Sequence, residues 1–339
     1  TKALGPVTGQ NYDIVSLGEL DADEIAAGDP PGRITVTFDR PICDGDGADF
    51  AVFENGFLAG QDIWAELGYC EVSSNGVDFA RFPSVSLTPE QATDYGIIYP
   101  TEVFGLVGKH ANNDGECWGT PFDLAGMADH PSVLNRDVDI RQITHVRIVD
   151  IPGSGDFDDQ APDVDPAEYA VDHPIYDGWP TWGSGGLDLE AVGVLKQLNP
   201  GDTSANGELD AEDIDLLYDV IAAGTTDLFY DVNEDGSVAV SDVDSLVQDI
   251  FGTNYGDVTL DGVVDLNDLS ILAANWNDTE DLGWAEGDFD GDGAVSLSDL
   301  SLLAASWGSP ATAAVPEPGT LLLVALGAAG VCRGRTGLI

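Results

Sequence analysis

The feature that most restricts how this chain can fold is a long acidic segment without a single basic residue. No lysine or arginine occurs between Lys196 and Arg333, whereas aspartates and glutamates are frequent from Asp202 to Asp299. A polyanion of this kind either stays expanded through self-repulsion or folds around cations that neutralise it. The regular apolar spacing inside the segment favours folding around cations, with a solvated acidic surface as the alternative.

The same segment contains an internal duplication. Residues 268–276 (DLSILAANW) return 31 positions later as residues 299–307 (DLSLLAASW). In both copies the apolar residues recur at i, i+3, i+4 and i+7, which is the stripe of a short amphipathic helix. Similar stripes cover residues 214–221 and 243–250. The segment therefore predicts four helices of about three turns each.

A twelve-residue acidic loop with glycine at its sixth position precedes each predicted helix. The loops cover residues 202–213, 231–242, 257–268 and 288–299. Oxygen-bearing side chains at loop positions 1, 3, 5, 9 and 12, with a main-chain carbonyl at position 7, give the ligand spacing that wraps one calcium ion. The predicted calcium ligands are Asp202, Ser204, Asn206, Glu208, Asp210, Asp213, Asp231, Asn233, Asp235, Ser237, Asp242, Asp257, Thr259, Asp261, Val263, Asp265, Asp268, Asp288, Asp290, Asp292, Ala294, Ser296 and Asp299.

Calcium is favoured over magnesium because a flexible cage of oxygens at about 2.3–2.6 Å suits it, whereas magnesium prefers a tighter octahedron and keeps its waters. Ser204 and Asn206 replace carboxylates in the first loop, so we expect that loop to bind most weakly. Ala239 offers no oxygen at position 9 of the second loop, where we expect a water. Aspartate caps at helix N-termini are the alternative, and they explain position 12 but not positions 1, 3 and 5. Apolar residues at position 8 are expected to pair the loops through a short strand; they are Leu209, Val238, Val264 and Val295.

The region before the loops, residues 1–197, is predicted to be all-β. Residues 34–38, 143–149 and 187–195 alternate apolar and polar positions, as half-buried strands do. Asn75-Gly76 suits a tight hairpin turn because both residues accept positive φ. Short strands separated by glycine-rich turns favour a β-sandwich or jelly roll.

Composition excludes some partners and leaves the cysteines undecided. The formal net charge of -51 repels phosphate backbones and anionic headgroups, which excludes nucleic acid and acidic membranes as default partners.

One disulfide among Cys43, Cys70 and Cys117 is expected, with the pair left open. The chain starts at Thr1 and its only methionine is Met127, so we expect a processed or truncated start.

Residues 256–269, paired with 287–300, resemble a type I dockerin, the calcium-binding module of cellulosome-type assemblies. The resemblance covers about 110 residues as two successive pairs, 198–253 and 254–309. It implies calcium as the cofactor, one EF-hand loop and exiting helix per repeat, and a cohesin-like partner that contacts loop positions 10 and 11. Those positions hold Ala211-Glu212, Val240-Ser241, Leu266-Asn267 and Leu297-Ser298. A calcium-stabilised spacer is the alternative to a docking role.

The C-terminal residues 310–339 are predicted to be a linker and sorting tail. Pro-Glu-Pro at 316–318, an apolar run at 321–332 and Arg333-Gly334-Arg335 resemble a PEP-CTERM sorting signal. That resemblance implies export to the cell surface or extracellular space, transient inner-membrane association and cleavage by an exosortase-type enzyme. The apolar run is shorter than the roughly 20 residues of an ordinary spanning helix, and a buried helix is the alternative.

Residues 15–195 resemble the amino-terminal β domain of PEP-CTERM surface proteins, through residues 49–55, 119–124 and 183–192. Three functions are open for this domain. The first is glycan binding, with Trp179 and Trp182 stacking on sugar rings. The second is glycoside hydrolysis by a pair of carboxylates. The third is a purely structural role. A further calcium site is weighed at two runs of aspartates, Asp44, Asp46 and Asp49 or Asp156, Asp158 and Asp159.

Overall fold

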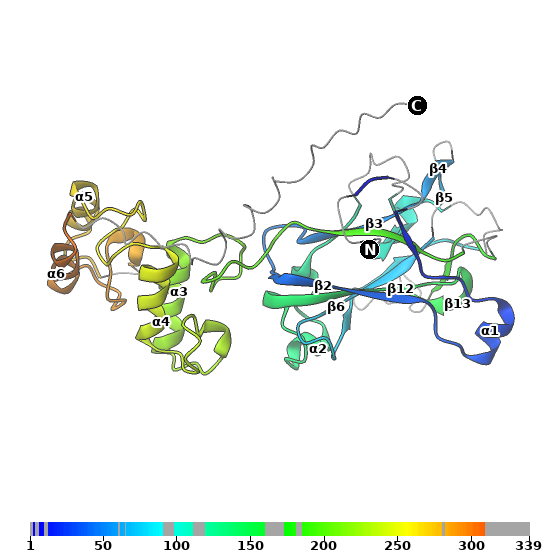
Figure 1. Cartoon of the computed structure of the whole chain (residues 1–339), viewed down its shortest axis with the longest axis horizontal. Coiled ribbons are helices and arrows are strands. Elements are labelled where there is room, and N and C mark those ends of the chain that lie inside the picture. The colour runs from blue at the N-terminus through cyan, green and yellow to red at the C-terminus, as the bar shows by residue number, and fades with distance from the viewer. Residues whose placement is uncertain are drawn as a thin grey trace, which may run out of the picture. The chain divides into compact units, whose positions relative to one another are not determined.

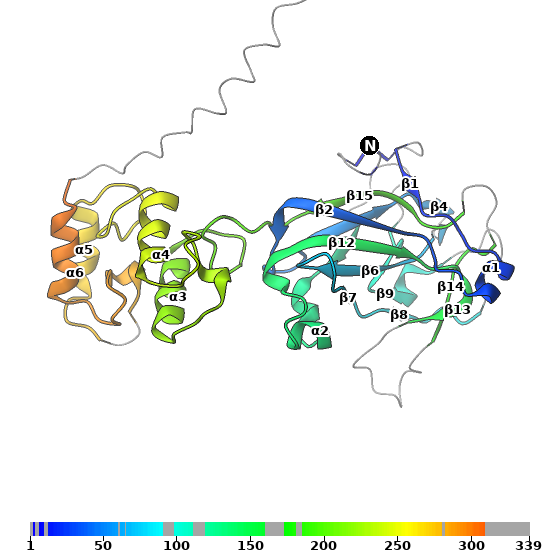
Figure 2. The ribbon, with the colours of Figure 1, turned by 60° about the horizontal axis from the view of Figure 1, so that its bottom comes forward.

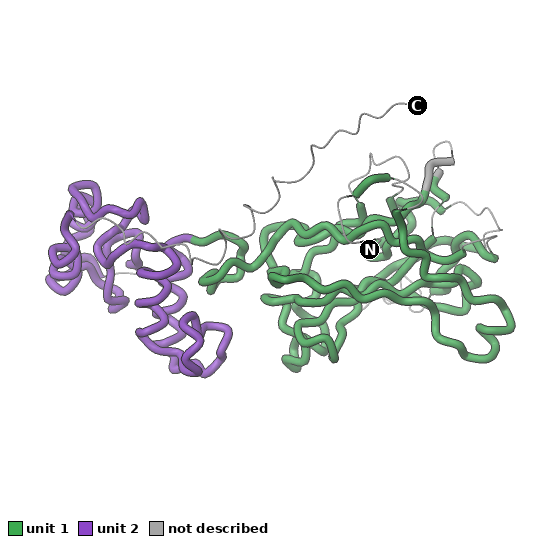
Figure 3. The backbone as a smooth tube through the Cα atoms, viewed as in Figure 1, with its two compact units in different colours: residues 1–209 green, residues 210–339 purple. Residues whose placement is uncertain are grey.

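The computed structural model describes residues 3, 7–9, 13–59, 62–64, 66–90, 98–110, 119–159, 173–180, 185–279 and 282–308. The chain forms two compact units, Thr1–Leu209 and Asp210–Ile339, which Figure 3 shows in green and purple. The division falls inside the first predicted calcium loop. The finer domain bounds set by the sequence stay a prediction.

The first unit is built from two antiparallel sheets (Figure 1). One has the strand order β1-β15-β3-β11 and the other β10-β6-β12-β2, with β7 paired to β6. The strands of the first sheet are β1 (Val15–Ser16), β3 (Phe50–Glu54), β11 (Thr120–Phe122) and β15 (Asp188–Val194). The strands of the second are β2 (Arg33–Ile42), β6 (Gly68–Ser73), β7 (Ala80–Arg81), β10 (Leu106–Val107) and β12 (Ile143–Asp150). Three two-stranded pairs are β4 (Phe57–Ala59) with β5 (Asp62–Trp64), β8 (Val85–Ser86) with β9 (Val103–Phe104), and β13 (Ser154–Asp158) with β14 (Pro174–Tyr176).

The two larger sheets share one hydrophobic core. Phe50 of β3 stacks on Phe122 of β11 with ring centroids 5.3 Å apart, and Phe82 packs against both rings. Val146 and Ile148 of β12 belong to the same buried cluster. Alternate residues of each strand face this core, as the period of two predicts. The prediction of a mostly β N-terminal region is confirmed, while its jelly-roll form stays a prediction.

Asn75 and Gly76 lie in the connection between β6 and β7, but this connection covers residues 74–79 and is not a tight hairpin turn, and of the two residues Gly76 alone has a positive φ. The side-chain oxygen of Asn75 accepts hydrogen bonds from the main-chain N–H groups of Val77 and Asp78. Gly76 has a φ of 73°, which a residue without Cβ adopts at little cost. The connection brings Arg81 opposite Glu71, a pairing that matters for the pocket described below.

Helical structure in the first unit is short. Asp21 caps α1 (Ala22–Ala27) and forms a capping box with Glu24. The other elements are α2 (Pro131–Leu134) and the 3₁₀ turns η1 (Pro100–Glu102), η2 (Leu124–Met127) and η3 (Ile140–Gln142).

The prediction of a disulfide among Cys43, Cys70 and Cys117 is wrong, because every possible pair needs Cys43 or Cys70. Cys43 and Cys70 are buried free thiols, and Cys117 lies outside the described residues. Burial raises the pKa of Cys43 to about 12, with the Asp202 and Asp49 carboxylates adding to the shift. Cys70 packs inside the sheet core, so both residues act as small buried side chains rather than as cross-links.

The second unit, Asp210–Ile339, holds the end of the first loop, the three later loops and the helix that follows each loop (Figure 2). Every helix begins at loop position 10. The helices are α3 (Ala211–Ala222), α4 (Val240–Ser245), which continues as the π-helical η5 (Leu246–Ile250), α5 (Leu266–Ala274) and α6 (Leu297–Ala305). Two 3₁₀ turns, η4 (Leu228–Tyr230) and η6 (Trp284–Glu286), precede the second and fourth loops. The predicted length of about three turns holds for α3, which has 12 residues. The helices α5 and α6 are shorter, with 9 residues each, or about two and a half turns.

Trp284 is the centre of the core of the second unit and is fully buried. Its ring contacts those of Tyr255 and Phe289, with centroids 5.7 and 5.0 Å away. Its main-chain N–H donates to Asp215 Oδ1 of α3 at 2.7 Å. The two loop–helix pairs therefore pack against each other within one unit.

The duplicated repeats 3 and 4 contact each other reciprocally. Gly256, just before the third loop, lies against Leu303 of α6, and Gly287, just before the fourth, lies against Leu272 of α5. The predicted pairing of loops through position 8 is wrong for these repeats. Val295 instead exchanges main-chain hydrogen bonds with residues 277 and 278, which follow α5, and Val264 accepts one from Gly308, which follows α6. Each loop is thus closed by the chain that leaves the other repeat's helix.

The predicted apolar stripe is only partly buried. Leu272 and Leu303 are buried, but Ala273 is exposed and the tryptophans at the ends of the stripes, Trp276 and Trp307, are 44% and 48% exposed. In the part of the chain that the structure describes, no helix has both the length and the apolar character that crossing a membrane requires.

Candidate functional site

The aspartate at position 1 of every loop turns its carboxylate into the loop. It accepts hydrogen bonds from the main-chain N–H groups of positions 5 and 6, for example from Asp235 at 3.0 Å and Gly236 at 2.8 Å in the case of Asp231. The pattern repeats at Asp202, Asp257 and Asp288. The sixth-position glycines all have φ between 83° and 90°, the left-handed backbone that this turn requires. They are Gly207, Gly236, Gly262 and Gly293.

The aspartate at position 12 is completely buried in all four loops. One of its oxygens accepts the main-chain N–H of position 9 at 2.8–2.9 Å. In the last loop the other oxygen of Asp299 accepts the N–H of Phe289 at 2.8 Å, so a single carboxylate holds both ends of the loop together. Position 12 is the third residue of the helix, and its carboxylate completes a capping box.

The helix cap itself is position 9. Asp210, Asp265 and Ser296 each accept a hydrogen bond from the N–H of position 11, while Ala239 has no side chain that could do so. Position 12 therefore does take part in helix capping, as the capping-box partner of the N-cap at position 9. Capping does not account for the carboxylates at positions 1, 3 and 5. The predicted ligands at position 9 have a structural role of their own in this structure.

The last loop gathers the most negative charge. Asp288, Asp290 and Asp292, at positions 1, 3 and 5, place one carboxylate oxygen each within 4.8 Å of one another. Burial, together with the nearby Asp299 carboxylate, raises the pKa of Asp288 to about 6. Three converging carboxylates beside a buried fourth are a donor set of hard oxygens, which fits calcium.

The other loops combine carboxylates with neutral oxygens. In the third loop Thr259 Oγ1 donates to Asp257 at 3.2 Å and to Asp268 at 3.3 Å, so positions 1, 3 and 12 converge there. In the second loop Asp242 accepts the N–H of Asn233, and the N–H of position 7, Ser237, donates to Asp235. In the first loop Ser204 Oγ donates to Asp202, and Asn206 Oδ1 accepts the N–H of Glu208. The main-chain carbonyls predicted at position 7 belong to Glu208, Ser237, Val263 and Ala294.

The structure brings together some of the predicted site residues of the first unit and not others. Trp179 is half-buried and its indole N–H donates to the main-chain oxygen of Leu20 at 3.0 Å, and Trp182 lies outside the described residues. Of the first aspartate run, Asp44 and Asp49 converge, together with Asp123 instead of the predicted Asp46. The buried carboxylate of Asp49 already accepts the N–H groups of Gly45 and Leu124.

The second aspartate run is not assembled as a site. Asp156 and Asp158 are exposed on β13, whereas Asp159 is buried and accepts the N–H groups of Ser86 and His173. Asp159 therefore fastens two segments of the chain to each other.

Sequence reasoning missed a group of buried carboxylates in the first unit. Burial raises the pKa of Glu66 to about 10 and that of Asp150 to about 7, and it raises those of Glu54 and Asp177 well above their ordinary values. Neighbouring carboxylates add to each shift. Asp150 Oδ1 accepts the N–H of Leu187, while its Oδ2 has no hydrogen-bond partner among the described residues. These acids come from separate strands and loops, so no local pattern could have indicated the group.

Two family models match the chain. Residues 255–306 match the dockerin type I domain, which covers the third and fourth loops with their helices. Residues 314–335 match the PEP-CTERM protein-sorting motif. The chain carries a type I dockerin domain and a PEP-CTERM sorting motif. No curated protein and no solved structure matches it. The first loop pair precedes the dockerin match, and the sorting motif lies outside the described residues.

The dockerin domain and the sorting motif together indicate an exported protein with a docking module. The reciprocal contacts of Gly256 and Gly287 are contacts between the two repeats of the dockerin domain.

Proposed function

We propose that the protein acts at the cell surface or in the extracellular matrix, where its dockerin domain binds calcium and docks to a cohesin-type partner. The observation that carries this proposal is the set of buried, inward-turned loop carboxylates. Asp257, Asp268, Asp288 and Asp299 are all at most 2% exposed, and no lysine or arginine occurs within the dockerin domain to neutralise them. Buried carboxylates need a counter-charge or a proton, and a calcium ion in each loop supplies the counter-charge.

The docking surface is the duplicated start of α5 and α6. Leu266 and Leu297, at loop position 10, are 66% and 69% exposed, and the adjacent Asn267 and Ser298 are exposed as well. A large exposed apolar side chain beside a polar one, held on a rigid helix, is a surface that a protein partner can cover. Calcium orders this surface because the loop ends where the helix begins.

The first loop pair extends the calcium-bound unit. It repeats the hydrogen-bond pattern of the dockerin loops, and α3 packs against η6 through Asp215 and Trp284. Tyr218 also donates its hydroxyl to the main-chain oxygen of Phe289 at 2.8 Å. We assign residues 198–253 the role of a calcium-stabilised spacer that buttresses the dockerin domain.

Glycan binding by the first unit is favoured over glycoside hydrolysis. The acids with the strongest upward pKa shifts, Glu54, Glu66 and Asp177, are nearly inaccessible, whereas a general acid must reach the glycosidic oxygen. Trp179 keeps part of its ring accessible while its N–H fixes it in place. The purely structural alternative predicts no saccharide affinity.

The test uses the full chain, freed of metal by a chelator. Calcium is titrated in by calorimetry, and binding to a panel of type I cohesin modules is then measured with calcium and with excess chelator. Saturable calcium binding and calcium-dependent capture of at least one cohesin are expected. The absence of calcium binding would overturn the proposal, whereas calcium binding without any cohesin capture would leave only the spacer role. Leu266→Asp combined with Leu297→Asp should abolish capture while calcium binding persists.

A further inference from the structure

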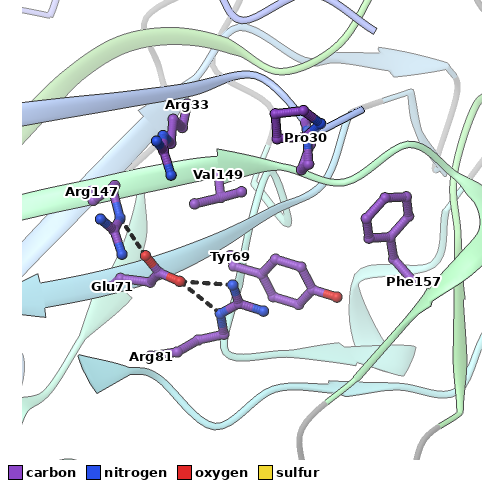
Figure 4. Close-up of a pocket in the computed structure, with 9 residues that line it drawn as sticks. Pro30, Arg33, Tyr69, Glu71, Arg81, Arg147, Val149 and Phe157 are labelled. Carbon is purple, nitrogen blue, oxygen red and sulfur yellow. Dashed lines mark hydrogen bonds and ion pairs between the residues drawn. The ribbon is translucent and has the colours of Figure 1, made fainter. Parts of the chain in front are cut away.

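Three of the few basic residues of this chain line one pocket on the first unit. The sequence holds 11 lysines and arginines against 62 acids, yet Arg33, Arg81 and Arg147 meet around a cavity of about 310 Å³ (Figure 4). Among the nine lining residues the only acid is Glu71. Three guanidinium groups against one carboxylate leave two positive charges in a pocket of a strongly acidic protein.

Strand register places these side chains on one face of the sheet. Arg147 of β12 lies opposite Glu71 of β6, and Glu71 lies opposite Arg81 of β7. One step further along the same face, Val149 lies between Arg33 of β2 and Tyr69 of β6. The residues that alternate with Arg147 and Val149 on β12, Val146 and Ile148, face the core. The pocket is therefore built on rigid strands rather than on loops.

Glu71 holds two of the three arginines in place. Its Oε1 accepts hydrogen bonds from Arg81 Nε at 2.9 Å and Nη2 at 2.7 Å, and its Oε2 accepts one from Arg147 Nε. The carboxylate is 7% exposed, which protects these bonds from water. Within the described chain the two terminal nitrogens of Arg147 form no hydrogen bond, and the side chain of Arg33 forms neither a hydrogen bond nor an ion pair. Donors therefore remain for a further acceptor.

Aromatic rings fix the planes of the same two arginines. Arg81 lies 3.9 Å from the ring centroid of Tyr69, and Arg147 lies 3.6 Å from that of Phe79. Stacked guanidinium groups keep their donor edges pointing outward in a set direction. The remaining walls of the cavity are apolar and come from Pro30, Pro31 and Phe157.

We propose that this pocket binds a single carboxylate carried on a ring-sized body with an apolar face, which is the chemistry of a uronic acid residue. Guanidinium forks match the two oxygens of a carboxylate, and the volume suits one or two small rings. The proline and phenylalanine walls suit the C–H face of a sugar ring. A single charge is favoured because the net charge of -51 repels a polyanion from the molecule as a whole. The site depends neither on calcium nor on docking.

The experiment titrates galacturonic acid, galactose and sodium sulfate into the full chain by calorimetry at low ionic strength. Galacturonic acid should bind with a stoichiometry of one, galactose should not bind, and sulfate should bind at least tenfold more weakly. Arg33→Gln should weaken galacturonic acid binding at least tenfold. The matched control, Arg136→Gln, removes the same charge from an exposed position after α2 and should change nothing.

Each alternative outcome contradicts the proposal in its own way. No galacturonic acid binding, or equal binding of galactose, would overturn it. Sulfate binding as tight as galacturonic acid would reduce the pocket to a plain anion site and overturn the uronate assignment. Equal weakening by Arg33→Gln and Arg136→Gln would show that overall charge, rather than the pocket, governs affinity. Because Arg33 is exposed at the start of β2, its replacement does not endanger the fold, and an unchanged melting temperature verifies this.

Discussion

The indole N–H of Trp284 donates a 2.8 Å hydrogen bond to the main-chain carbonyl of Asp257, the first residue of the third loop. This bond connects the hydrophobic core of the second unit to a calcium loop. Loop geometry and core packing are consequently coupled, so a change in the loop should alter the core packing, and a change in the core should alter the loop.

Replacing Trp284 by phenylalanine should destabilise the second unit by about 2–4 kcal/mol, because the Asp257 carbonyl loses its buried donor and the smaller ring leaves a cavity. Chemical denaturation in saturating calcium measures the change. Trp307→Phe is the matched control, since that ring is 48% exposed and should cost less than about 1 kcal/mol. Equal losses for the two variants would show that Trp284 has no special structural role.

Asp290→Asn should separate metal binding from folding. Asp290 is exposed and converges with Asp288 and Asp292, yet its side chain forms no hydrogen bond in the described structure. Calcium affinity of one site should fall roughly tenfold or more because a charged ligand is lost, while the stability of the metal-free chain should not change. Calorimetric titration provides the comparison, with Asp278→Asn as an exposed control outside the loops. A similar loss of affinity in the control would refute the ligand assignment.

Removal of calcium from the full chain should reduce its helical circular dichroism. In the described structure the long helices lie in the second unit, where the loop carboxylates repel one another without a cation, so folding is coupled to metal binding. Adding calcium back should restore the signal. A spectrum that does not respond to the chelator would rule out this coupling.

The first unit should lose stability as the pH rises from about 4 to about 7 in the absence of metal. Burial, followed by the charges of Glu19 and Asp188, raises the pKa of Asp150 to about 7 in the folded state. A carboxyl with a raised folded pKa keeps its proton in the folded chain after the unfolded chain has released it, so its contribution is present at low pH and lost across this window. The carboxyls of Glu66, Glu54 and Asp177 shift in the same direction.

Asp150→Asn tests this effect because asparagine keeps the acceptor for the N–H of Leu187 and cannot ionise. At pH 7.5 the variant should be more stable than the wild type by about 2–4 kcal/mol, and at pH 4 the difference should nearly vanish. Thermal unfolding at both pH values measures it, with the exposed Asp39→Asn as control. A constant difference between variant and wild type across the range would exclude titration of Asp150 as the cause.

The sequence predicted much of the second unit because its interactions are local. A carboxylate at position 1 bonds to amides four and five residues later, and the aspartate at position 12 bonds three residues back to position 9, so spacing alone encodes the loop. The mistaken pairing at position 8 shows the limit, since Val295 finds its partner at residues 277 and 278 only once two repeats have packed together.

By itself the sequence determined the four loops, the helices that follow them, the strand-rich first unit and the two family matches, because each depends on residues that are close along the chain or on a contiguous motif. Only the tertiary structure decided which side chains meet across strands. Arg33, Glu71, Arg81 and Arg147 converge through the register of β2, β6, β7 and β12, and Glu66 joins Asp150 and Asp177 through chain segments more than 80 residues apart. Such contacts arise from packing and hydrogen-bond register between distant segments, which no local spacing records.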